Sequence, residues 1–168
     1  MKRIIPGILA ATLLTAASCS KNNNTTTTPT TPASTIPADG WILKGVSYKS
    51  QLGFTDDNMV GVTDAIPSGS NPQVNNFAAH FKTLPTTAGT YKIVFWADND
   101  SLATDEVGIS ATIIASNSTY MCTGTDGKTA TVTMVNGKIK VEVPEIKVFT
   151  VSPSPDTTTL TGTILQTM

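Results

Sequence analysis

The alternation of apolar and polar residues on both sides of Asn136-Gly137 constrains the fold of this chain more than any other feature. The apolar positions are Ala130, Val132, Met134, Ile139, Val141 and Val143, separated mostly by threonine or charged residues. A period of two places apolar side chains on one face of a β-strand, and Asn-Gly tolerates the positive φ of a tight hairpin turn. The segment therefore predicts a hairpin, and the pair Asp126-Gly127 predicts another tight turn just before it.

Short segments of the same kind recur through residues 40–168, separated by turn residues about every ten positions. Strands are predicted over 41–49, 73–84, 90–97, 106–115, 146–151 and 160–166. A short helical turn is the alternative for 73–84, and 90–97 is predicted as a central strand covered on both faces. The fold class predicted is all-β, an antiparallel β-sandwich of immunoglobulin-like or Greek-key/meander topology. The alternative is a closed β-barrel with an interior ligand.

The N-terminus has the features of a secretory signal. Lys2 and Arg3 precede an apolar run over 4–17, and the small residues Ala16-Ala17-Ser18 lead to Cys19. The apolar run is shorter than the roughly 20 residues that a bilayer-spanning helix needs. We therefore predict that 1–18 is a signal peptide rather than a retained transmembrane helix.

The small residues directly before Cys19 resemble the lipobox of bacterial lipoproteins. The resemblance implies that the cysteine sulfur receives a diacylglycerol and that its new amino group is acylated after cleavage. Two or three acyl chains hold a protein durably to a membrane. Cys19 is therefore the predicted lipidation site, and secretion with Cys19 as a free thiol is the alternative.

Residues 20–39 contain almost no apolar side chain and three prolines, so they cannot bury enough surface to fold by themselves. We predict that 19–39 comprises the lipidated cysteine and a disordered Thr/Pro-rich tether. The remaining residues, 40–168, are predicted to form one all-β domain.

Four segments of that domain resemble small lipoproteins of Bacteroidota. They are WILKGVSYK at 41–49, FKTLPTTAGTYKIV at 81–94, TATVTMVNGKIKVEVP at 129–144 and LTGTI at 160–164. The resemblance implies a β-sandwich on a tether in the cell envelope, as an outer-membrane lipoprotein that is surface-exposed or faces the periplasm. It implies no catalytic residues. We expect a non-enzymatic interaction module with a protein or glycan partner, and an accessory glycan-binding lipoprotein is the alternative.

Charge and residue counts exclude several function classes. Loss of Lys2 and Arg3 with the signal leaves 9 of the 11 basic side chains against 12 acidic ones, a formal charge of −3. Such a chain does not attract the phosphate backbone of a nucleic acid. His80 is the only histidine, which disfavours a catalytic triad. Cys122 has no basic neighbour in the sequence and is predicted to be a buried small hydrophobe.

An acidic segment supplies a candidate metal site. Asp98, Asp100 and Asp105 lie between two predicted strands, where carboxylates could converge on Ca²⁺. The EF-hand pattern is absent, and a solvated acidic loop is the alternative. Two further tripeptides, at 100–102 and 156–158, resemble the acceptor of an O-glycosylation system of Bacteroidota, which makes Ser101 and Thr157 candidate glycosylation sites.

Three aromatic residues are candidates for ligand binding: Trp96, Tyr91 and Trp41. Sugar C–H groups stack on flat aromatic rings, but most such rings pack in a core or at its rim. In a regular strand Trp96 shares a face with Val94, opposite Tyr91. The exposure of Trp96 therefore decides between a glycan platform and core packing.

Overall fold

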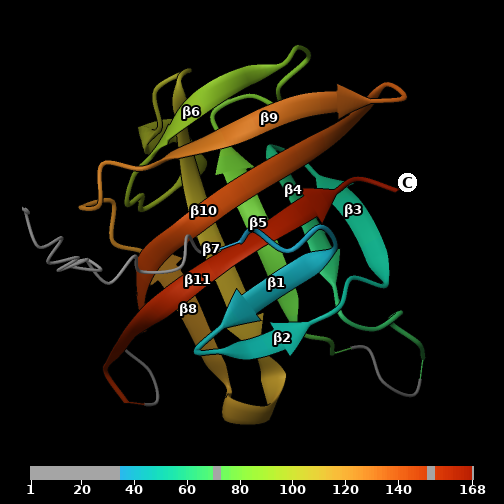
Figure 1. The fold of residues 1–168 in the computed structure, drawn as a ribbon, viewed down its shortest axis with the longest axis vertical. Helices are drawn as coiled ribbons and strands as arrows, with labels where there is room; N and C mark the ends of the chain where they lie inside the picture. Colours follow the sequence, from blue (N-terminus) through green and yellow to red (C-terminus); the bar gives the residue numbers. More distant parts are fainter. Residues whose placement is uncertain (1–34, 70–72, 151–153, 168) are drawn as a thin grey trace, which may run out of the picture. The chain divides into compact units, whose positions relative to one another are not determined.

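The computed structural model describes residues 35–69, 73–150 and 154–167. In these residues the chain forms eleven β-strands and two short 3-10 helices, and none of them lies in an α-helix (Figure 1). The strands are β1 (Gly40–Leu43), β2 (Val46–Tyr48), β3 (Leu52–Asp56), β4 (Met59–Thr63), β5 (Asn76–Phe81), β6 (Gly89–Ile93), β7 (Glu106–Ile113), β8 (Ser118–Cys122), β9 (Thr129–Val135), β10 (Lys138–Thr150) and β11 (Asp156–Leu165). The 3-10 helices are η1 (Asn99–Ser101) and η2 (Ile114–Ser116). In this part of the chain no helix is long and apolar enough to span a membrane.

Five of the strands close into a ring. β6 pairs with β7, β7 with β8, β8 with β10, β10 with β9, and β9 with β6. The long strand β10 makes this closure possible because its first half pairs with β9 and its second half with β8, on either side of a register shift between Val143 and Ile146. The pair β6–β7 is parallel and the other pairs of the ring are antiparallel, so the barrel is mixed.

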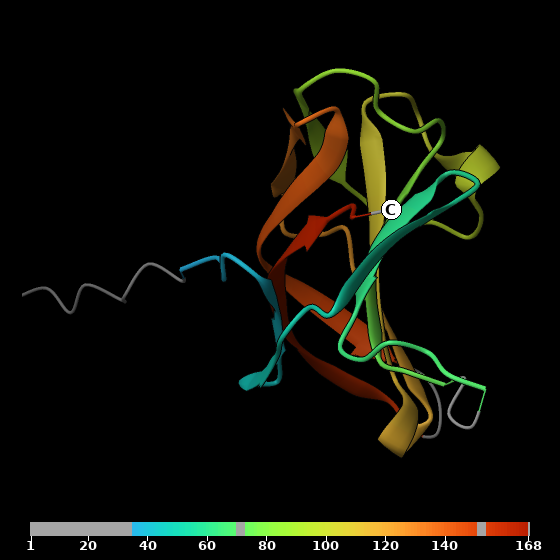
Figure 2. The ribbon, with the colours of Figure 1, turned by 90° about the vertical axis from the view of Figure 1, so that its right-hand side faces the viewer.

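The other six strands extend the ring in two groups. β11, β1 and β2 continue the sheet from β10, while β5, β4 and β3 continue it from β7. The two groups face each other, as the blue and red strands face the green ones in Figure 2. Trp41 of β1 meets Phe77 of β5 between them, with ring centroids 5.9 Å apart. The layers thus share one core with the barrel.

Alternation within single strands explains how the core forms. On β7, Val107, Ile109 and Ala111 are fully buried, and on β5, Phe77 and Phe81 point to the same interior. Each large apolar side chain buried in this way stabilises the fold by about 1.5–3 kcal/mol. The strand predicted over 73–84 is confirmed, because β5 has the period of two and 73–84 contains no helix.

Two turns that join neighbouring strands have a common geometry. Asn136 and Gly137 have φ of 52° and 76°, and they join β9 to β10 in the predicted hairpin. Lys44 and Gly45 have φ of 55° and 76°, and they reverse the chain between β1 and β2. The single strand predicted over 41–49 is therefore wrong, since a two-residue turn divides it into a hairpin.

The hairpin predicted at Asp126-Gly127 is wrong, although Gly127 has the positive φ expected, 61°. β8 and β9 do not pair with each other, because β8 lies between β7 and β10 while β9 lies between β10 and β6. Asp126 instead stabilises the connecting loop by accepting a hydrogen bond from the backbone N–H of Lys147 at 2.5 Å. The hairpin of β3 and β4, with Asp57 at φ 44° in its turn, was not predicted at all.

The all-β class predicted from the sequence is confirmed. The structure closes five strands as in the barrel alternative, but the parallel pair β6–β7 makes the ring different from an up-and-down barrel. The prediction of a central strand covered on both faces over 90–97 fails, because β6 ends at Ile93 and its residues Thr90 and Lys92 are exposed.

Candidate functional site

Two aromatic rings lie directly on the backbone of the outer sheet face, above glycines. A methyl group at Gly61 of β4 would lie 2.6 Å from the Phe54 ring, and one at Gly108 of β7 would lie 2.3 Å from the Trp96 indole. Such distances are far below van der Waals contact, so only glycine allows the rings to come this close. The two rings stand at separate places on the face formed by β3, β4, β5, β7 and β8.

A groove of about 310 Å³ lies on this face and includes both rings. This volume is at the lower end of the range for small-molecule sites. The lining residues are Phe54, Met59, Asn76, His80, Trp96, Ser110, Thr112, Thr119 and Met121. The strand register brings them together, because Ser110 lies opposite both Ala78 and Met121, while His80 lies opposite Met59.

His80 is the only titratable side chain of the groove that could carry a charge near neutral pH. Its Nε2 lies 2.9 Å from Ser110 Oγ, and its ring packs on Trp96 with centroids 4.6 Å apart. Burial lowers the pKa of His80 to about 4, because the charged imidazolium loses its hydration. The imidazole is therefore neutral at pH 7, and no Asp, Glu, Lys or Arg lines the groove.

The polar side chains of the groove form one row across the strands. Asn76 lies opposite Thr112, which lies opposite Thr119, and the two threonine hydroxyl oxygens are 3.2 Å apart. Four positions further along β5, His80 lies opposite Gly108, above which the Trp96 ring stands. The groove thus has hydroxyl and amide groups along one side and rings along the other.

The pair His80–Ser110 is a weak candidate for nucleophilic catalysis. A general base works best when its pKa is close to the working pH, and an imidazole with a pKa of about 4 has little tendency to take a proton from an alcohol. No carboxylate lines the groove to orient the ring. The arrangement can donate and accept hydrogen bonds, which suits binding.

The three aromatic residues singled out in the sequence lie in three different environments. Trp96 is 6% exposed and belongs to the hydrophobic core cluster, so the core alternative is confirmed for it, and its ring also forms a wall of the groove. Trp41 is fully buried between the layers, stacked on Tyr48 at 5.0 Å. Tyr91 is half-buried and meets Phe81 edge to face at 5.1 Å. The structure therefore does not bring the three rings together into a platform.

A different aromatic residue next to Trp96 is the exposed one. Phe95 is 52% exposed and contacts Phe149, with ring centroids 5.8 Å apart. The predicted alternation fails here because β6 ends at Ile93, so 94–97 no longer follow the period of a strand. Phe54 and Met59 were missed because no strand was predicted over β3 and β4. No local pattern marks them, because Phe54 lies opposite Gly61 only once β3 pairs with β4.

The acidic segment does not assemble a metal site. The Asp98 carboxylate accepts a hydrogen bond from the Ser101 N–H at 2.8 Å and caps η1. Within 35–69, 73–150 and 154–167, no three His, Cys, Asp or Glu side chains come together as metal ligands, so Asp98, Asp100 and Asp105 remain separate. The arrangement of the described residues lends no support to the Ca²⁺ candidate at this loop, and calcium binding stays a prediction.

The candidate glycosylation sites are both on the surface. Ser101 is exposed and donates a hydrogen bond to the Asp98 carbonyl at 2.6 Å. Thr157 is exposed at the start of β11, inside a strand rather than in the loop expected. Glycosylation of either residue stays a prediction.

The N-terminal predictions fall mostly outside the described residues. The signal peptide over 1–18, the lipidation site Cys19 and most of the tether lie there. The last part of the predicted tether is described, and the Pro37 carbonyl accepts a hydrogen bond from the Thr163 hydroxyl at 2.6 Å. The tether prediction therefore extends too far, since residues near Pro37 are held against β11.

Cys122 is buried as predicted. Its Sγ donates a hydrogen bond to the Val94 carbonyl at 2.9 Å and accepts one from the Ile109 N–H at 3.3 Å. Burial raises the pKa of the Cys122 thiol to about 11, because the thiolate loses its hydration. The thiol is thus protonated at neutral pH and acts as a packing residue.

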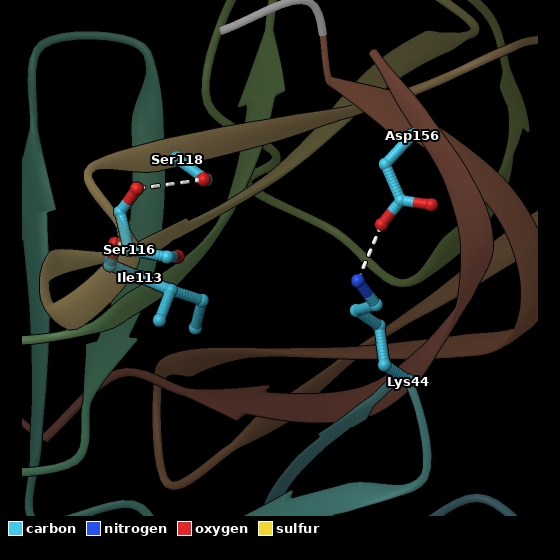
Figure 3. A network of polar contacts seen from close by, with 5 residues as sticks. All are labelled: Lys44, Ile113, Ser116, Ser118 and Asp156. Atoms are coloured by element: carbon cyan, nitrogen blue, oxygen red, sulfur yellow. Dashed lines mark hydrogen bonds and ion pairs between the residues drawn. The ribbon is translucent and has the colours of Figure 1, made fainter. Parts of the chain in front are cut away.

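Two polar contacts that lie elsewhere stabilise turns rather than form a site. Figure 3 shows Lys44 of the β1–β2 turn pointing toward Asp156 at the start of β11, where the two form an ion pair. The hydrogen bond between them raises the pKa of Lys44 and lowers that of Asp156. At the end of η2, the Ser116 carbonyl accepts a hydrogen bond at 3.0 Å from the hydroxyl of Ser118, the first residue of β8.

A second hollow, of about 370 Å³, lies beside Asp64, Asn75 and Ile114. The Asn75 amide and the Asp64 carboxylate of this hollow bond each other, because Asn75 donates to Asp64 at 2.6 Å, and Asn75 also accepts from the Ile114 N–H at 2.7 Å. The groove around Trp96 and His80 is therefore the better candidate site.

Comparison of the chain with protein-family models, curated proteins and solved structures found no match.

Proposed function

We propose that the chain is an extracytoplasmic lipoprotein whose β domain is a non-enzymatic binding module, and that the groove on its outer sheet face takes the ligand. The observation that carries the proposal is the groove itself, with its rings held on Gly61 and Gly108. A glycine inside a strand often marks a place where a ligand approaches closely, and here two such glycines lie beside one groove. This support concerns the binding site alone.

The proposal of binding rather than catalysis rests on the chemistry of the groove. Its one hydroxyl–imidazole pair, Ser110 with His80, has a weak base and no carboxylate beside it. The remaining polar groups are Asn76, Thr112 and Thr119, which donate and accept hydrogen bonds but do not titrate near neutral pH.

The proposed location follows from the N-terminal sequence. A positive start, a short apolar run and Cys19 after small residues support an anchor in the cell envelope, as an outer-membrane lipoprotein at the surface or facing the periplasm. We also propose that the two outer groups of strands form an antiparallel sandwich beside the barrel, supported by the contact of Trp41 with Phe77.

An accessory glycan-binding role is the second candidate. It is supported by the row of Asn76, Thr112 and Thr119, whose polar groups could bond sugar hydroxyls near Trp96. It ranks second because sugars stack on an open aromatic face, and the Trp96 ring is 6% exposed and packed on His80.

Anchoring and binding are tested separately. In a bacterial host fed an alkyne fatty acid, the full chain should become labelled and sediment with membranes, and Cys19→Ala should remove both. Unlabelled wild-type chain contradicts the anchor.

For binding, the melting temperature of the full chain is measured against a panel of small molecules and glycans, since a ligand of the folded state raises it. Thr119→Tyr fills the groove, whereas Thr129→Tyr makes the same change at an exposed site on β9. A ligand should stabilise the wild type and Thr129→Tyr but leave Thr119→Tyr unchanged. If no compound separates the two variants, the groove is not a binding site.

A further inference from the structure

The groove excludes charged ligands by its own composition. Its nine lining residues include no Asp, Glu, Lys or Arg, and His80 is neutral at pH 7. A charged group that left water for this site would lose hydration without gaining an opposite charge, which is costly. A ligand that fits the groove is therefore uncharged where it contacts these residues.

Rings and sulfur atoms define the apolar part. Phe54 and Trp96 are fixed against the sheet, above Gly61 and Gly108. Met59 and Met121 line the groove as well, and the methionine thioether makes favourable contacts with aromatic rings. Four such side chains around about 310 Å³ suit a flat apolar body of roughly one or two rings.

Hydroxyl groups define the polar part. The hydroxyl oxygens of Thr112 and Thr119 lie 3.2 Å apart, beside the amide of Asn76. Each hydroxyl can donate or accept a hydrogen bond, and Ser110 shares its hydroxyl with His80. A ligand hydroxyl or carbonyl group at this side would be matched by several partners.

From these three features we propose that the groove binds a free small molecule that is uncharged, with a flat apolar body and a hydroxyl or carbonyl group. The inference rests on the proposed binding function and adds the class of ligand. It assigns the body to Phe54 and the two methionines, with the mostly buried Trp96 as a wall behind them, and the polar group to Asn76, Thr112 and Thr119.

The test uses three probes of one size that differ in charge: benzyl alcohol, benzoate and benzylammonium. The full chain, in lipid nanodiscs and ¹³C-labelled at methionine methyls, is titrated at pH 7 and followed by NMR. Met59 and Met121 report on the groove, and Met134 of β9 is the control for effects outside it. Benzyl alcohol should shift the first two signals saturably, with an affinity at least about tenfold above that of either ion.

The matched variants complete the test. Thr119→Tyr should abolish the shifts caused by benzyl alcohol, while Thr129→Tyr should keep them, and a thermal melt of each variant shows that it is folded. If benzoate or benzylammonium binds in the groove as tightly as benzyl alcohol, the proposed uncharged ligand class is wrong, but the proposed binding function is not contradicted. Benzyl alcohol that shifts neither methionine, or shifts Met134 equally, also overturns the class. If no compound of the panel described above separates Thr119→Tyr from Thr129→Tyr either, the proposed binding function is also wrong.

Discussion

The two tryptophans of this chain are both buried, yet they belong to regions of different character. Trp41 is 0% exposed and Trp96 is 6% exposed, and each lies against a glycine, Gly162 for the first and Gly108 for the second. Around Trp41 the neighbours are Tyr48 and Phe77, and its indole N–H has no hydrogen-bond partner. Trp96 instead packs on the His80 imidazole, in a groove that holds both polar and apolar side chains. The chemical nature of the neighbouring residues, more than the exposed fraction of the side chain, therefore distinguishes a core position from a site position.

The strand β5 connects these two regions. Its residue Phe77 points inward to Trp41, while His80 points outward to Trp96. The alternation of a single strand therefore contributes to the core on one face and to the groove on the other. Changes at each face should consequently have separable effects, which the following predictions test from the largest to the smallest.

Replacement of Trp41 by alanine should have the largest effect. The change removes a fully buried ring that packs between the layers, and the free energy of unfolding should fall by about 4 kcal/mol. Urea denaturation measures it. Trp41→Phe is the control and should cost much less, because it keeps an aromatic ring and removes the unpartnered N–H. A loss under about 1 kcal/mol for Trp41→Ala would show that the region is not a core.

Gly108→Ala should expel Trp96 from the groove wall. The new methyl group would lie 2.3 Å from the indole, so the ring must move toward water, at a cost of about 2–3 kcal/mol. The fluorescence emission of the chain should shift to the red. Gly89→Ala in β6 is the control, because its methyl group would meet only the Tyr91 ring at 3.5 Å. Equal effects of the two changes would contradict the close packing of Trp96 on β7.

His80 should make the stability of the fold depend on pH. The pKa of His80 is lowered to about 4 in the folded chain from 6.5, so between these values the unfolded chain binds more protons and stability falls as pH falls. From pH 7 to pH 5 the loss should be about 2 kcal/mol. Urea denaturation at each pH measures it, and His80→Gln should remove this part of the dependence. An unchanged slope in that variant would place the titration elsewhere.

Phe95→Ala should have the smallest effect and sharpen the contrast with its neighbour Trp96. Phe95 is 52% exposed and contacts mainly Phe149, so its loss should change stability by under about 0.5 kcal/mol. It should also leave the NMR shifts of Met59 and Met121 with benzyl alcohol unchanged. A variant that loses the binding of benzyl alcohol would extend the site beyond the groove.

The fold could be predicted from the sequence where the signals were local. The hairpin at Asn136-Gly137 and the alternation of β7 needed only neighbouring residues. Asp126-Gly127 was misread because β8 and β9 do not pair with each other and instead take β10 and β6 as their second partners, which no local pattern shows. The Lys44 turn lacked the usual Asn or Asp before its glycine, so its positive φ was not evident.

The candidate site was harder to predict because it depends on the register of strands. His80 and Trp96 stood out as the only histidine and a rare residue type, but their contact requires β5 to lie beside β7. The glycine under each ring is a long-range fact, since Gly61 faces Phe54 and Gly108 faces Trp96 only after the sheet forms. Residue counts and local periods do not contain this information.

The pairing of the first strand with the last also sets the order of events during synthesis. Gly40 of β1 lies opposite Thr163 of β11, so the neighbour of β1 in the sheet is missing until β11 has been synthesised. Contacts between residues so far apart close late and slowly. A stop codon before β11 would leave both Trp41 and Val143 without the strand that pairs beside them, whereas the five-strand ring does not include β11 and would keep all its pairs.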